Sequence, residues 1–429
     1  MTHRGRHRRR RRGKALRAGL AGAALALTAA ATMISTSQAS VSDDPGALRP
    51  LDSAAGLAPL REDPVPGPEL DRLAAVMGPP VGVGAVLAEA DHSLRNAADC
   101  TADDERALPV EPAATRSYCF GAADTRAWSA GAVTTSGEAD RDGLWGGNRV
   151  ILSAWSREGA PDGSPGPARI AVVDANHPAR LRYTWALLAV PVDGGRDYRA
   201  LSSAVSGMAW FRNRLLVTTG EREHGALYVF DMDRIQRTTV DGAAVGWTGG
   251  GWSAAGARFV LPAVDAYRPS EAGDPPRLGG LSVDRSTVPE SLVASEAVPV
   301  GSDGPTRLWR YRLDPGPGRT GLPAVDPAGR AVPDAAYETD VTGVRGVLSY
   351  HSRWYVGQAG GTRGWRGALW RQDAEGARGA RCGSRVRAHH CWSREPRSLS
   401  YWQETGEVWS QAGRALFALP LASLDGSLG

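Results

Sequence analysis

The stretch Gly207-Met208-Ala209-Trp210, followed after a turn by Leu215-Leu216-Val217, decides the fold class. It has a small, an apolar, a small and an aromatic residue in a row, then a turn, then an apolar run. The same order recurs in Gly280-Leu281-Ser282-Val283, in Gly346-Val347-Leu348-Ser349-Tyr350, in Ser398-Leu399-Ser400-Tyr401 and, more loosely, from Gly131. The five copies start 76, 73, 66 and 52 residues apart, which indicates an internal repeat.

Each copy is followed by a third β-type run. These runs are residues 168–174, 226–231, 306–313, 368–371 and 415–419, and a fourth run often follows, as at 181–190 and 258–264. Three or four antiparallel strands per unit are typical of propeller blades, which bury both faces only by packing around an axis. The sequence therefore predicts an all-β protein, a β-propeller of five or six blades over residues 99–424. The alternative is a pair of β-sandwiches.

The last copy ends at Leu421 and lacks an obvious fourth strand. An N-terminal segment, either residues 81–87 or the stretch around Phe120, would supply that strand and close the ring. Residues 81–130 would also contribute to a sixth blade if there is one.

The first 39 residues have the three-part order of a secretory signal peptide. A basic run from Arg4 to Arg17 carries nine positive charges and no acid, an alanine-rich apolar stretch follows to Ile34, and Ser37-Gln38-Ala39 supplies small residues for cleavage. The alternative is a membrane anchor, for which this apolar core is short. We expect cleavage, by the general secretory or the twin-arginine route, and a secreted, extracellular protein without a membrane span.

Removing that leader reverses the net charge. The whole chain has 50 basic and 46 acidic residues, and removing the nine basic residues of the leader leaves 41 against 46. A net negative mature chain argues against a nucleic-acid partner. Lys14 is the only lysine, which excludes lysine-dependent mechanisms from the mature chain. The sequence indicates no cofactor.

The four cysteines form two local pairs, Cys100 with Cys119 and Cys382 with Cys391. An even, locally paired set in an exported protein predicts two disulfides. The alternative is a metal site in which the adjacent His389-His390 joins the second pair. Three ligands in consecutive positions do not converge easily on one tetrahedral ion, so disulfides are preferred.

Residues 40–98 are predicted to be a flexible N-terminal segment. The part up to residue 67 is rich in Pro, Ala, Asp and Gly and shows no periodicity, which is typical of a tether. A short helix is expected from Pro68 to Met77, because Leu70, Leu73 and Met77 would share one side of it.

Several short motifs occur in order between residues 118 and 420. They are Phe120-Gly121-Ala122-Ala123-Asp124, Trp128 with Val133-Thr134-Thr135, Leu144-Trp145-Gly146, Tyr228-Val229-Phe230-Asp231, residues 280–286 and Ser398-Leu399-Ser400-Tyr401-Trp402. Together they resemble a family of secreted actinobacterial proteins that is β-propeller-like and functionally uncharacterised. The resemblance implies fold and export, and it offers no activity or catalytic residue to transfer.

That family has polar residues where the chain enters the first strand of several blades. The matching positions here are Ala130-Gly131, Arg345-Gly346 and Arg397-Ser398, so a polar site shared by the family would be altered in this chain.

In a propeller, the segments that enter the innermost strand and those that follow the second strand line one mouth of the channel. By that geometry the candidate binding residues are Glu221, Glu296, Arg345, Gln358, Arg397 and Gln411. Because arginine offers a planar fork of donors to carboxylates, they would bind a polar or anionic ligand. The alternative is that they form solvated ion pairs around a water-filled channel. The ligand is unknown, and a cell-envelope glycan or a protein is the expected kind of partner.

No motif predicts catalysis, so catalytic residues are unknown and we expect a non-catalytic binding or scaffold module. No Gly-x-Ser-x-Gly occurs. Asp231-Met232-Asp233 is better explained as a strand end than as a metal site, because carboxylates at strand ends accept hydrogen bonds from free backbone N–H groups.

The alternative to a non-catalytic module is a lactonase- or glycosidase-like extracellular hydrolase with its site at the channel mouth. A glycosidase needs two carboxyls about 5–10 Å apart, and the sequence offers Glu221 with Glu296.

Overall fold

The computed structural model describes residues 44–53, 56–159, 165–220, 225–270, 277–298, 304–361, 365–383 and 388–428. The described residues, from Asp44 onward, belong to one compact unit. The predicted leader, residues 1–39, lies outside the described residues. Within the described residues, no helix has the length and apolar character needed to cross a membrane.

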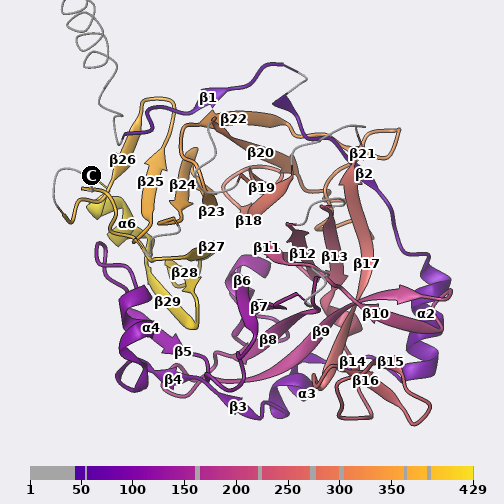
Figure 1. Ribbon diagram of the computed structural model, residues 1–429. Helices are drawn as coiled ribbons and strands as arrows, with labels where there is room; N and C mark the ends of the chain where they lie inside the picture. The colour runs from indigo at the N-terminus through magenta and orange to yellow at the C-terminus, as the bar shows by residue number, and fades with distance from the viewer. Residues whose placement is uncertain are drawn as a thin grey trace, which may run out of the picture. The chain divides into compact units, whose positions relative to one another are not determined.

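Five groups of antiparallel strands make up most of the unit, and the protein is all-β as expected (Figure 1). Group 1 consists of β6 (Trp128–Thr135), β7 (Val150–Arg157), β8 (Ala168–Asp174) and β9 (Arg182–Val192). Group 2 consists of β11 (Val205–Phe211), β12 (Arg214–Thr219), β13 (Leu227–Asp231) and β17 (Phe259–Pro269). Group 3 consists of β18 (Leu278–Asp284), β19 (Ser291–Glu296), β20 (Thr306–Arg312) and β22 (Ala335–Thr339).

The other two groups contain the C-terminal strands and one N-terminal strand. Group 4 consists of β23 (Val344–Tyr350), β24 (Arg353–Gln358), β25 (Ala368–Gln372) and β26 (Ala377–Gly379). Group 5 consists of β27 (Pro396–Trp402), β28 (Glu407–Ala412), β29 (Ala415–Pro420) and β5 (Arg116–Cys119).

The hydrophobic core lies between neighbouring groups. Separate clusters of buried apolar residues lie between groups 1 and 2, 2 and 3, 3 and 4, 4 and 5, and 5 and 1. Strands such as β7 and β8 are therefore buried along almost their whole length. Burial on both faces explains why these strands are nearly continuous apolar runs in the sequence.

The first strands of the five groups contact one another in cyclic order, and Figure 1 shows them near the middle of the unit. Small residues allow this approach. A Cβ built on Gly207 would lie 2.3 Å from the backbone oxygen of Gly279, and one built on Gly346 would lie 2.9 Å from the carbonyl carbon of Ser398. The cycle closes where the backbone N–H of Val133 donates a 3.2 Å hydrogen bond to the Ser398 hydroxyl.

The fourth strand of group 5 comes from the N-terminal half of the chain. β5 pairs with β29 on one side and with β4 (Arg95–Asn96) on the other. The expectation that the stretch around Phe120 supplies this strand is confirmed, since β5 ends one residue before Phe120. The alternative, residues 81–87, is wrong because that stretch enters helix α3 (Val83–Ala88). In the described part of the chain, residues 81–130 form no sheet of their own that would be a sixth group.

The fourth strands of groups 1 and 2 make a contact that the sequence analysis did not predict. β9 and β17 pair in parallel, with Phe259 opposite Ala186, and join the two groups into one path of eight strands. That path begins at β11 and ends at β6, which contact each other, so it nearly closes on itself.

The N-terminal segment differs from the expected flexible tether. β1 (Arg49–Pro50) pairs with β22, and β2 (Leu60–Glu62) pairs with β17. Buried Leu48 and Leu60 anchor the segment. These isolated apolar residues stand among Pro and Gly, and so the composition alone indicated a linker. The predicted helix is confirmed as α2 (Gly67–Met77), with the three expected apolar side chains buried.

Both predicted disulfides are present. The Cα atoms are 5.8 Å apart in Cys100–Cys119 and 5.6 Å apart in Cys382–Cys391. The metal-site alternative is therefore wrong for these cysteines.

The remaining elements of the described chain are short. They are β3 (His92–Ser93), β10 (Asp197–Ala200), β14 (Gln236–Arg237), β15 (Val245–Trp247), β16 (Trp252–Ala254), β21 (Arg330–Ala331), α4 (Ala102–Ala107), α5 (Ser136–Ala139), α6 (Leu421–Ser427), η2 (Ala97–Asp99) and η3 (Met232–Arg234).

Candidate functional site

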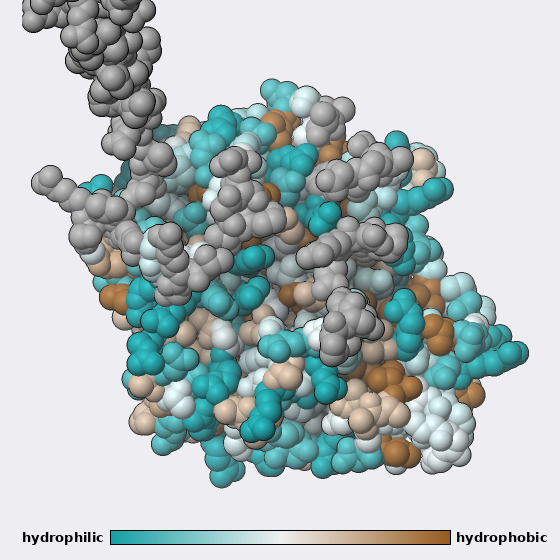
Figure 2. All heavy atoms as spheres, in the orientation of Figure 1, coloured by the Kyte–Doolittle hydropathy of each residue, from teal (hydrophilic) through white to brown (hydrophobic). Residues whose placement is uncertain are grey.

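Hydrophilic residues cover most of the coloured surface in Figure 2, and hydrophobic residues appear there in small separate groups. Among the described residues, the exposed large apolar side chains are Val76, Val110, Trp247, Val288 and Val332, which are far apart in the sequence. A binding site on the coloured part of that face would therefore rest on polar and charged groups.

Two arginines at the ring of first strands form such a group. Arg345 lies near the start of β23, and Arg397 lies near the start of β27. The residues that follow them, Gly346 and Ser398, are in backbone contact, so the two arginines enter the ring side by side. We call Arg345 and Arg397 the guanidinium pair.

A β-bulge occurs at or directly after each arginine: Arg345 is skipped in the pairing of β23 with β24, and Arg397, which pairs with Gln411, is the last regular residue before the irregularity in β27. The register of β23 against β24 shifts between Val344 and Gly346, and the register of β27 against β28 shifts between Arg397 and Ser400. A bulge leaves an extra residue unpaired in one strand and redirects its side chain. The left-handed φ of 59° at Ser398 belongs to the same irregularity.

The electrostatics of the guanidinium pair show an excess of positive charge. Burial lowers the pKa of Arg345 and of Arg397, because a buried guanidinium loses hydration. The charge of Arg345 lowers the pKa of Arg397 further, while Glu395 raises the pKa of both. The Glu395 carboxylate lies 3.9 Å from Arg397 and is 71% exposed, so its compensation is weak.

No hydrogen bond to a described residue holds either guanidinium, and their one ion-pair contact is with Glu395. Buried charges in proteins are ordinarily paired and hydrogen-bonded. Arg345 and Arg397 are only half-buried, and none of their nitrogens is among the buried atoms that lack a partner, so their donors reach solvent, where an anion would pair with them.

A second pair of arginines lies close by in the sequence. Burial lowers the pKa of Arg366, and the charge of Arg394 lowers it further. Arg366 donates to the backbone oxygen of Leu108, and the buried Nε of Arg394 has no partner among the described residues. The sequence analysis missed both residues, although Arg394 stands three positions before Arg397 in Arg394-Glu395-Pro396-Arg397.

Of the other predicted binding residues, the three that the structure describes make no hydrogen bond to the guanidinium pair among the described residues. The Glu296 carboxylate accepts hydrogen bonds from Nε and Nη2 of Arg307 at 2.9 and 2.6 Å, within group 3. Gln411 is opposite Arg397 in the ladder, but its buried amide accepts from Ser153 and donates to Gly413. Gln358 ends β24, opposite Val344. Glu221 lies outside the described residues.

The residues considered for metal binding have other roles. Oδ1 of Asp231 accepts from the backbone N–H of Asp233 at 3.0 Å, as expected at a strand end, and Oδ2 pairs with Arg214 at 2.7 Å. His389 and His390 each place Nδ1 against backbone oxygens. Within the described ranges, no cluster of three or more His, Cys, Asp or Glu residues could hold a metal ion.

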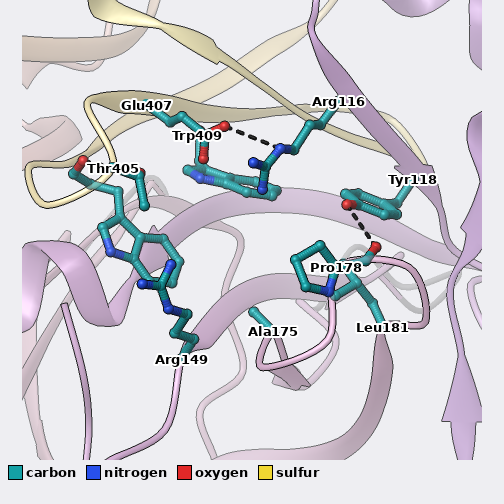
Figure 3. A pocket seen from close by; sticks show the side chains of 10 residues that line it. Arg116, Tyr118, Arg149, Ala175, Pro178, Leu181, Thr405, Glu407 and Trp409 are labelled. Atoms are coloured by element: carbon teal, nitrogen blue, oxygen red, sulfur yellow. Dashed lines mark hydrogen bonds and ion pairs between the residues drawn. The ribbon is translucent and has the colours of Figure 1, made fainter.

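An aromatic cavity lies between groups 5 and 1. Figure 3 shows Tyr118 and Trp409 on one side and Pro178 on the other, and the Tyr118 hydroxyl donates to the Pro178 oxygen at 3.0 Å. Arg116 pairs with Glu407 at 3.2 Å beside it. The cavity volume is about 30 Å³, which is room for about one or two water molecules. It is too small to hold an organic ligand.

Comparisons with known proteins do not place this chain in a family. No family model matches the chain, and no curated protein matches it. Among solved structures, a computationally designed protein named Ika4 is 13% identical, with a TM-score of 0.22, over 54% of this chain and 96% of that one. At that score the likeness carries no argument about fold or function.

Proposed function

We propose that the five strand groups are the blades of a five-bladed β-propeller. The cyclic contact of the five first strands and the five core clusters between neighbouring groups support this arrangement. The last sheet joins β5 to β29, which is how a propeller holds its ends together. The resemblance to the secreted actinobacterial propeller-like family agrees with this proposal.

The protein is, in this proposal, a secreted binding module for an anionic ligand that carries a carboxylate or phosphate group. One observation carries it: Arg345 and Arg397 are neighbouring, half-buried arginines, with Glu395 as their one weak partner in the described part of the chain. Arginine forks bind such groups through two parallel hydrogen bonds. The signal-like leader and the two disulfides support export.

The competing hydrolase hypothesis has less support. It nominated Glu221 and Glu296 as a carboxylate pair, and Glu296 is bound bidentately by Arg307. Both oxygens of that carboxylate are occupied by Arg307 and are therefore not free to reach a substrate.

A thermal-unfolding experiment with simple anions tests the proposal. Exported, disulfide-bonded protein is unfolded in sodium chloride, sulfate or phosphate at matched ionic strength. Sulfate and phosphate should raise Tm above its value in chloride, because a ligand that binds only the folded state stabilises it. The R345Q/R397Q double variant should lose this gain, while R141Q, which alters an arginine that is 70% exposed, should keep it. An equal gain in the wild type and the double variant would refute the anion site.

A further inference from the structure

A second cavity lies between groups 3 and 4, at the end of β23 opposite to Arg345. Its volume is about 380 Å³, within the range of ligand pockets. Its walls include the turn after β23 and parts of β20, β22 and β24. The residues that matter to its chemistry are Arg310, Tyr337, His351, Trp354 and Asp373. We call this cavity the aromatic groove.

A buried polar network fixes one wall of the groove. The Asp284 carboxylate is fully buried and accepts from Nη1 of Arg310 at 2.7 Å and from the Ser349 hydroxyl at 2.6 Å. Nη2 of Arg310 lies 2.7 Å from the same hydroxyl. The Arg310 charge is thus neutralised inside the protein, and its guanidinium is held in one position.

Aromatic rings form a corner next to that guanidinium. Tyr337 and Trp354 have ring centroids 5.6 Å apart and planes at 61°. Cζ of Arg310 lies 5.3 Å from the Trp354 ring centroid. Trp354 is 2% exposed and is covered by Arg310 and Tyr337, so the ring that can meet a ligand is the half-buried Tyr337. A π face carries partial negative charge that attracts the slightly positive C–H groups of a saturated ring.

The remaining polar groups of the groove suit hydroxyls. Oδ1 of Asp373 accepts from the backbone N–H groups of Glu375 and Gly376, while Oδ2 has no hydrogen-bond partner in the described residues. The backbone N–H of His351 donates to the Ser286 hydroxyl at 2.8 Å, which fixes the turn that carries the imidazole. A carboxylate oxygen, an imidazole and the Tyr337 hydroxyl can each bond to a hydroxyl group.

The balance of charge decides between ligand classes. Asp284 offsets Arg310, so Asp373 leaves the groove with one formal negative charge when His351 is neutral. An anion would be repelled, in contrast to the guanidinium pair. From the accessible Tyr337 ring, the free acceptor and this charge, we propose that the aromatic groove binds a neutral pyranose sugar unit of a glycan. This inference does not depend on the anion site.

Saturation-transfer NMR on the exported protein tests it with four neutral probes: maltotriose, cellotriose, chitotriose and mannotriose. At least one should bind, and galacturonic acid trimer should bind more weakly than the best of them because its carboxylates face Asp373. Y337A should weaken binding about tenfold, which corresponds to about 1.4 kcal/mol. D373N should retain the turn through its amide oxygen and should improve binding of the uronic acid probe.

W247A is the matched control, because Trp247 is an aromatic residue that is 54% exposed elsewhere on the surface. It should leave sugar binding unchanged. Y337A must keep the wild-type Tm within about 2 °C, because about 1 kcal/mol shifts the Tm of a domain this large by no more than that, so that lost binding is not lost folding. Failure of all four probes at millimolar concentration, loss of binding in W247A but not in Y337A, or preference for the uronic acid would each overturn the proposal.

Discussion

The backbone N–H of Val283 donates a 2.6 Å hydrogen bond to the carboxylate of Glu138. Glu138 belongs to α5, directly after β6, and Val283 belongs to β18, so the bond joins groups 1 and 3. The same carboxylate accepts from the hydroxyls of Thr134 at 2.5 Å and of Ser400 in group 5 at 3.2 Å. One carboxylate that is 1% exposed therefore ties three groups together at one end of the ring.

Glu138 should make stability depend on pH. Burial raises the pKa of Glu138 from 4.5 to about 7, against the opposing hydrogen bonds and the charge of Arg285. Between these two values the folded chain keeps a proton that the unfolded chain releases. Its stabilising contribution is therefore full below the lower value, falls as pH rises and is lost above the upper one. Urea unfolding near pH 5 and near pH 8 should show a fall of up to about 3 kcal/mol from this group.

E138Q supplies the control for that measurement. Its amide is neutral at every pH and still offers an oxygen to Val283, so this part of the slope should disappear. Asp265 titrates in a similar range, because burial and Glu62 raise its pKa to about 7, but it contributes equally to both proteins. An identical slope in wild type and E138Q would show that Glu138 stays ionised.

Two glycines of one hairpin should respond to alanine by different amounts. A Cβ on Gly346 would lie 2.9 and 3.0 Å from the Ser398 carbonyl group, whereas a Cβ on Gly357 would meet nothing closer than 3.6 Å. G346A should therefore lower the free energy of unfolding by about 1–3 kcal/mol. G357A should change it by less than about 1 kcal/mol. Equal effects in denaturant titrations would mean that the first strands are farther apart than described.

Removing the Cys100–Cys119 disulfide should weaken the closure of group 5. The bridge spans 19 residues and ends in β5, so C100S/C119S should cost about 3 kcal/mol in the loop-entropy model. Hydrogen exchange should increase more in β29, the partner of β5, than in β12. C382S/C391S, which opens a shorter span of 9 residues, is the comparison and should leave β29 less affected. Uniform loss of protection would contradict this local role.

Leu60 tests whether the N-terminal segment belongs to the fold. Its side chain is 2% exposed, so L60A should destabilise the protein by about 2–4 kcal/mol. V76A, which truncates a residue that is 50% exposed, should change stability by less than about 0.5 kcal/mol. An unaltered unfolding midpoint for L60A would support the flexible tether after all.

Local sequence was enough to predict most strands. Runs such as Leu215-Leu216-Val217 are apolar on both faces, and they lie in β12, as expected. The long-range pairings were harder. The parallel contact of β9 with β17 and the docking of Leu60 depend on surfaces that exist only after the groups have packed, and no local pattern encodes them.

The candidate site was predictable in part for the same reason. Arg345 and Arg397 were nominated from their place before a first strand, which is a local property. Glu296 and Gln411 are occupied by hydrogen-bond partners from other strands, Arg307 and Ser153. The sequence gives no sign of these pairings, so it could not exclude the two residues from the site. The role of Glu138 was missed because a single acid after a strand looks like an ordinary turn residue.

The pairing of β5 with β29 has a consequence for the order of events during synthesis. A ribosome releases Arg116–Cys119 long before Ala415–Pro420, so the nascent chain carries an unpaired strand edge throughout elongation. The hairpin of β4 and β5 gives that strand a local partner, and the Cys100–Cys119 bridge adds a covalent clamp once the chain reaches an oxidising compartment. The last strands to emerge then meet a ready template, and the whole chain must be completed before the final sheet can form.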